Sequence, residues 1–211
     1  MDSARTHTAA FAATVMAAGL LVAGCGQDDS SSAATTSSAT NTTSATVSTS
    51  AAPTPAGSKD YASLLMKPED IPPTPDGAFT ADPPEVDLTT TPIDISRMYK
   101  SGPNLIQSAI VLQPDAAMAV QWLNSVAAHI PSQQTGTPVP APSVTPDAIV
   151  VIGTSTDGKR AMTTLLFTVD NASAMVMFAS PDVTTPAPQD FAESVGKVQV
   201  AAIQAALPGL K

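Results

Sequence analysis

Three short apolar runs separated by turn signals constrain the fold of this chain more than any other feature. Residues 149–152 and 161–169 flank Asp157-Gly158, a favoured pair for a tight hairpin, and Asp170-Asn171 leads directly into a third run at 173–179. Runs of this length, rich in β-branched and large apolar residues, are typical of strands. The pattern predicts a three-stranded antiparallel meander.

The elements on either side of the meander complete a fold class. Residues 93–99 and 105–112 predict two more strands with a turn between them, and a helix is expected between Pro114 and Pro131. A last helix is expected from Gln189 to about Pro208. We therefore expect an α+β fold, with one antiparallel sheet of about five strands and two amphipathic helices on one face.

The strand at 173–179 is apolar on both of its faces, because Met175 and Met177 alternate with Val176 and Phe178. Such a strand is either covered on both sides or meets a ligand on one of them. Methionine adapts to irregular apolar partners, so an acyl-chain pocket and simple core filling both remain open, with core filling favoured. The candidate ligand-facing side chains are Trp122, Met162, Leu166, Met175, Met177 and Phe178.

Two proline-rich segments interrupt the regular elements. Residues 68–92 predict an irregular, extended lead-in, and residues 131–146 form a long loop that is either a lid or, as we favour, an insertion. Gly196 interrupts the last helical pattern, and close packing against the sheet is the expected reason. Residues 60–211 are expected to form a single domain.

The N-terminal segment carries the most specific motif in the sequence. An apolar run of about 16 residues, too short for a comfortable membrane span, ends in Leu21-Val22-Ala23-Gly24-Cys25, which resembles a bacterial lipobox. The resemblance implies that residues 1–24 are a signal peptide cleaved between Gly24 and Cys25, and that Cys25 is lipidated. Two or more acyl chains give a stable membrane anchor. The alternative is an uncleaved helix with an incidental cysteine.

Residues 25–59 begin with the cysteine that is expected to be lipidated, and the rest of the segment consists mostly of Ser, Thr, Ala and Pro. A segment with so little apolar surface cannot offset the entropy of ordering, so we expect a disordered tether. Its composition also suits O-glycosylation of an exported stalk, and an unmodified linker is equally expected.

The charge and cysteine content exclude several function classes. The chain has 18 acidic and nine basic residues, a net charge of −9, which predicts no binding to nucleic acid. Cys25 is the only cysteine, so disulfides, thiolate nucleophiles and cysteine-ligated metals are not expected once it is acylated.

No constellation of catalytic or metal-binding residues stands out. His129 is the sole candidate base after the signal peptide, and a hydrolase that uses it is the least favoured function. Asp82, Glu85 and Asp87 cluster in the lead-in, but they lack the glycine of a calcium loop and are interpreted as solvated charge. We predict no catalytic residue, no metal site and no cofactor.

The combination of Val22-Ala23-Gly24-Cys25, a Ser/Thr/Ala/Pro tether and a small α+β domain closing on a long helix resembles actinobacterial, especially mycobacterial, cell-envelope lipoproteins of the Lpq/Lpp type. Some of these have a fold similar to PsbP, and related domains are extracellular sensors of mycobacterial kinases. The resemblance implies an extracytoplasmic protein, anchored to the cell membrane by lipid. We expect a non-enzymatic binding module for a hydrophobic or glycolipid ligand or an envelope protein; the alternative is an accessory lipoprotein that positions an envelope complex.

Overall fold

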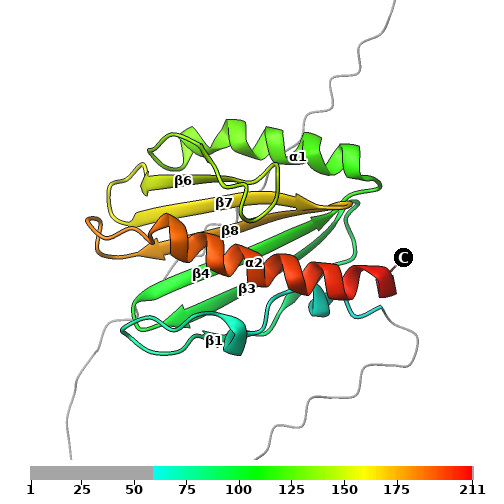
Figure 1. The fold of residues 1–211 in the computed structure, drawn as a ribbon, viewed down its shortest axis with the longest axis horizontal. Helices are drawn as coiled ribbons and strands as arrows, with labels where there is room; N and C mark the ends of the chain where they lie inside the picture. The colour runs from blue at the N-terminus through cyan, green and yellow to red at the C-terminus, as the bar shows by residue number, and fades with distance from the viewer. Residues whose placement is uncertain (1–58, 211) are drawn as a thin grey trace, which may run out of the picture. The chain divides into compact units, whose positions relative to one another are not determined.

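The computed structural model describes residues 59–210, so the predictions of a signal peptide, a lipidated Cys25 and a tether lie outside the described residues. An eight-stranded antiparallel sheet runs in the order β1-β3-β4-β8-β7-β6-β5, with β2 also pairing with β3 (Figure 1). The strands are β1 (Thr80–Ala81), β2 (Glu85–Asp87), β3 (Ile93–Ser101), β4 (Asn104–Leu112), β5 (Val139–Pro140), β6 (Ile149–Thr154), β7 (Ala161–Val169) and β8 (Ala172–Ser180). The helices are α1 (Ala116–His129) and α2 (Gln189–Ala206), with the 3₁₀ turns η1 (Tyr61–Leu64), η2 (Pro68–Asp70), η3 (Ile130–Ser132) and η4 (Leu207–Leu210).

The α+β class and the antiparallel sheet are confirmed, and the sheet has more strands than the expected five. The five expected strands are β3, β4, β6, β7 and β8, and the additional ones are β1, β2 and β5, each two or three residues long. These three lie in the proline-rich lead-in and in the loop before β6, where such short pairings leave no periodic pattern in the sequence. They cover the two edges of the sheet.

The two helices lie on opposite faces of the sheet, which corrects the expectation that both lie on one face. Leu165 and Phe167 of β7 belong to the cluster that packs against α2, whereas the intervening Leu166 packs against α1. Successive side chains of a strand point to opposite faces. The sequence showed that β8 is apolar on both faces, but it did not show whether or by which helix each face is covered.

Helix α1 begins as its sequence predicts. The Asp115 carboxylate accepts a hydrogen bond from the Met118 backbone N–H at 2.8 Å and caps the first turn. The side of α1 that faces β7 and β8 carries the buried Ala119 and Leu123, and Ile130, just after the helix, is also buried. The hydroxyl of Ser173 on β8 donates to the Ala119 carbonyl at 3.0 Å, which fixes the start of α1 over that strand.

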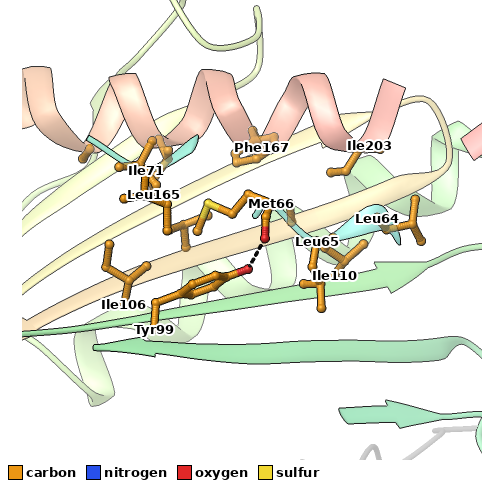
Figure 2. Close-up of a cluster of buried hydrophobic side chains, with 14 of the residues drawn as sticks. Leu64, Leu65, Met66, Ile71, Tyr99, Ile106, Ile110, Leu165, Phe167 and Ile203 are labelled. Carbon is orange, nitrogen blue, oxygen red and sulfur yellow. Dashed lines mark hydrogen bonds between the residues drawn. The ribbon is translucent and has the colours of Figure 1, made fainter. Parts of the chain in front are cut away.

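The main core lies between the sheet and α2, and residues 64–66, before the proline-rich lead-in, close one end of it (Figure 2). Leu64, Leu65 and Met66 insert beside α2. The Tyr99 hydroxyl, fully buried on β3, donates to the Met66 carbonyl at 2.7 Å (Figure 2). The segment after η1 is therefore held to the sheet by a buried polar contact as well as by apolar packing.

A buried glutamine on α2 joins the same segment to the helix. Gln199 is 0 % exposed, and its Nε2 donates to the Leu64 carbonyl at 2.6 Å. Its Oε1 accepts from the Ser108 hydroxyl at 2.8 Å and from the Met66 N–H at 3.3 Å. One side chain thus satisfies polar groups of β4 and of residues 64–66 inside the core.

Gly196 lets α2 approach the sheet closely, as its place in the helical pattern predicts. A Cβ atom at this position would lie 2.5 Å from Leu165 Cδ2 and 3.1 Å from Val144 Cγ1. Leu165 is fully buried, so it has little room to give way. Glycine is unfavourable inside a helix, but at this position it allows the close contact between α2 and the sheet.

We expect the substitution Gly196→Leu to lower the free energy of unfolding by about 2 kcal/mol, because overpacking a filled core forces side chains and backbone apart. Urea unfolding followed by circular dichroism measures the change. Gly209→Leu is the control, since nothing lies within 4 Å of the position of its Cβ. An unchanged unfolding midpoint for Gly196→Leu would contradict the close approach.

The loop at 131–148 packs along the sheet edge and over the core. Gln134 is buried and donates to the Val151 carbonyl at 3.1 Å, Ala141 and Ala148 are buried, and Val144 contacts the Gly196 region. The loop does not line the apolar pocket at the start of α2. Part of it, β5, pairs with β6, and the interpretation of the loop as an insertion stays a prediction.

Candidate functional site

An apolar pocket opens where the sheet ends beside the start of α2. Its volume is about 480 Å³, within the range of pockets that hold drug-sized ligands. The first residues of β4, the last residues of β8 and the first turn of α2 form three of its walls. The proline-rich segments 73–79 and 181–188 complete it.

Three phenylalanines form the apolar interior of this pocket. Phe178 comes from β8, Phe191 from α2 and Phe79 from the lead-in. The rings of Phe178 and Phe191 meet edge to face, with centroids 5.8 Å apart and planes at 68°. Phe79 and Phe178 are almost completely buried, so these two rings are held firmly by the core.

Prolines supply much of the remaining wall. A proline has no backbone N–H, so a wall built from prolines offers few hydrogen-bond donors to a ligand. The interior therefore selects for apolar shape, not for a pattern of polar groups. The lining prolines are Pro73, Pro75, Pro103, Pro181, Pro186 and Pro188.

Polar side chains gather at the margin. The Asn104 amide donates to the Asp76 carboxylate at 2.8 Å. Hydrogen bonds from the Thr184 hydroxyl, the Thr184 N–H and the Thr185 hydroxyl lower the pKa of Asp182 below its usual range. The margin thus carries a carboxylate that stays ionised at neutral pH, beside an apolar interior.

The six side chains that the sequence singled out do not gather at one place. Only Phe178 lines the 480 Å³ pocket. Leu166 is completely buried beneath α1 with Met175 packed beside it, and Trp122 is half-buried on α1. Met162 and Met177 lie half-buried on the face of the sheet opposite α2. Contact of these side chains with a ligand stays a prediction.

Phe79 and Phe191 were not predicted from the sequence as ligand-facing residues. The available signal was composition. Four phenylalanines follow Cys25 in the sequence, and three of them line this pocket. Phe79 and Phe191 each lie within a few residues of a proline-rich segment. No periodic pattern links them, since the pocket combines positions more than 100 residues apart.

The candidate base and the acidic lead-in lie elsewhere. His129 is exposed at the end of α1, and its Nδ1 forms a hydrogen bond with the Ser125 carbonyl oxygen of the same helix at 2.7 Å. It does not line the 480 Å³ pocket. Within residues 59–210, no three His, Cys, Asp or Glu side chains come together as metal ligands.

No protein-family model matches this chain, and no curated protein matches it. Among solved structures, it is similar to the extracellular domain of PknH from Mycobacterium tuberculosis, with a TM-score of 0.49 and 11% sequence identity. The similarity covers 68% of this chain and 94% of that one. The Lpq/Lpp type and the PsbP-like fold stay predictions. No helix between residues 59 and 210 is long and apolar enough to cross a bilayer.

Proposed function

We propose that this chain is a non-enzymatic lipoprotein of the cell envelope, anchored through Cys25, whose domain binds an apolar ligand in the pocket at the start of α2. The observation that supports the ligand most directly is a 480 Å³ cavity lined by three phenylalanines and six prolines. The anchor is supported by the lipobox-like run that ends at Cys25.

The chemistry of the pocket favours a lipid chain over a polar metabolite. A polar ligand would need donors and acceptors in the interior, and the polar side chains described above lie at the margin. A free or esterified acyl chain has an apolar body that suits the phenylalanine walls. Its polar end would reach solvent at the margin without contacting the carboxylates of Asp76 and Asp182.

The first experiment identifies the ligand. The purified full chain is extracted with organic solvent, and the extract is analysed by mass spectrometry. We expect one or a few lipids in a fixed ratio to protein. An extract that matches a blank purification, together with failure to bind an added fatty acid, would overturn the lipid proposal.

A substitution at the pocket wall is expected to block binding. Ala187 lines the pocket and is partly buried, and a phenylalanine there would fill part of the cavity. We expect Ala187→Phe to weaken binding of cis-parinaric acid, followed by its fluorescence, by more than about tenfold, which is about 1.4 kcal/mol.

Ala205→Phe is the matched control, because Ala205 is exposed near the other end of α2 and does not line the pocket. It is expected to bind cis-parinaric acid as the unmodified chain does. Thermal unfolding of both variants separates loss of binding from loss of fold. Equal binding by the two variants, both folded, would place the ligand elsewhere.

A further inference from the structure

The face of the sheet opposite α2 is covered over only part of its width. Helix α1 packs on β7 and β8, and its main contacts do not extend to β3 or β4. Beyond α1 lies a set of partly exposed side chains that we call the open face. It consists of Met98, Gln107, Ala109, Met162 and Met177.

The strand register shows that the open face is continuous. Met98 pairs with Gln107, and Gln107 pairs with Met177, so these three side chains form one row across β3, β4 and β8. On the other face of the same strands, the side chains of Tyr99, Ser108 and Val176 are 0 % exposed. On these strands the face towards α2 is therefore buried, whereas the opposite face is partly exposed. Met98, Met162 and Met177 lie on the exposed face.

Carboxylates border the open face on the side away from α1. Glu85 pairs with Ser96, and Asp87 pairs with Asp94, so all three acidic side chains project on the same face as Met98. Glu85 and Asp87 are exposed, and Asp94 is partly open to solvent. Partial removal of its carboxyl group from water and the neighbouring charge of Asp87 raise the pKa of Asp94. Among residues 59–210, no ion pair joins Glu85, Asp87 or Asp94 to a cation.

A small hollow connects the methionines to this acidic border. Its volume is about 100 Å³, and Met98, Gln107 and Glu85 all line it. Arg97 and Asp82 also line it, and Asp82 is already paired with Lys100 at 2.7 Å. The hollow is therefore a place where an apolar contact and a contact with a free carboxylate are available together.

We propose that the open face and its acidic border dock a basic amphipathic helix of another protein, with its apolar side on the methionines and its lysines or arginines against Glu85, Asp87 and Asp94. Methionine-rich surfaces adapt to helices of different shape. Complementary charge directs the encounter and the orientation.

The negative charge of the acidic border also argues against three other possible occupants of the open face. Residues 26–58 contain two aspartates and no lysine or arginine, so the preceding segment of this chain does not complement the border. A second copy would bring another net charge of −9. An anionic membrane surface would be repelled in the same way.

The test uses the full chain and a labelled helical peptide of leucine and lysine, with binding followed by fluorescence anisotropy at low and high salt. We expect saturable binding that weakens with salt. Glu85→Gln/Asp87→Asn is expected to weaken it by about tenfold, since two charge contacts are lost. The control pair Glu69→Gln/Asp70→Asn removes the same two charge types from exposed positions in the lead-in and is expected to leave binding within about twofold.

A second pair of variants tests the methionines. Met177→Gln is expected to weaken peptide binding, whereas Val139→Gln, at an exposed position on the far edge of the sheet, leaves it unchanged. Because Met177 does not line the phenylalanine pocket, Met177→Gln should bind cis-parinaric acid normally, which separates this proposal from the proposed lipid site.

Three results would overturn the proposal. The first is no binding of the leucine–lysine peptide, and the second is equal binding of a peptide with glutamate in place of lysine. The third is a self-association of the full chain, seen by sedimentation, that Met177→Gln abolishes, because the open face would then be occupied by a second copy.

Discussion

Replacing Gln199 with alanine is expected to lower the free energy of unfolding by about 4 kcal/mol, the largest effect of any single substitution considered for this protein. Inside the core, the Gln199 amide donates a hydrogen bond to the Leu64 carbonyl and accepts hydrogen bonds from the Met66 N–H and the Ser108 hydroxyl. Alanine would leave these three groups without a partner and would also leave a cavity. Each unsatisfied buried group costs about 1–3 kcal/mol.

Urea unfolding measures this effect, and the same helix provides the control. Gln204 lies on α2 but is exposed, so Gln204→Ala should change the unfolding free energy by less than about 0.5 kcal/mol. Hydrogen exchange gives a second readout, because the Leu64–Met66 segment should exchange faster in Gln199→Ala. Equal stabilities of the two variants would show that the Leu64–Met66 segment is held by apolar packing alone.

The second large effect is a loss of stability at alkaline pH that depends on Tyr99. Burial raises the pKa of its phenol to about 12, with the nearby Arg97 charge acting in the opposite direction. The unfolded phenol has a pKa of about 10. Because the folded value is the higher one, the stabilisation is fully present below about pH 10 and is lost as the pH rises towards 12, on the order of 2–3 kcal/mol in all.

Tyr99→Phe should reveal this loss when the free energy of unfolding is plotted against pH. The curves of the variant and of the unmodified chain are expected to cross. At neutral pH the variant lacks the hydrogen bond to the Met66 carbonyl and is expected to be about 1 kcal/mol less stable. Above about pH 11 the unmodified chain should become the less stable of the two. Urea unfolding between pH 7 and 12 tests this, with Tyr61→Phe as the control at the only other tyrosine. Parallel curves for Tyr99→Phe and the unmodified chain would show that the phenol is not the group that titrates.

The strands were predictable because their sequence patterns are local. The pair Asp170-Asn171 separates two apolar runs, and the structure joins β7 to β8 at that point, with Asp170 in a left-handed conformation at φ 54°. Asp157-Gly158 also marks a turn, although the connection between β6 and β7 is six residues long instead of two. Local signals located both turns.

The faces and the pocket were not predictable, because they depend on contacts between distant residues. Leu165 and Leu166 are equally apolar, and only the completed fold shows that one lies under α2 and the other under α1. The pocket requires Phe79, Phe178 and Phe191 to meet, and the proline-rich segments that bring them together have no periodic pattern.

The ends of the described chain lie side by side, since the Lys59 ammonium donates to the Leu210 carbonyl at 2.5 Å. This contact is at the C-terminal end of α2, whereas the phenylalanine pocket is at its N-terminal end, and 18 residues of helix, about 27 Å, separate them. With the anchoring proposed at Cys25, the connection to the membrane would enter the domain beside the end of α2 that is farther from the pocket. The proposed ligand site would then lie at the opposite end of the helix from the point of attachment.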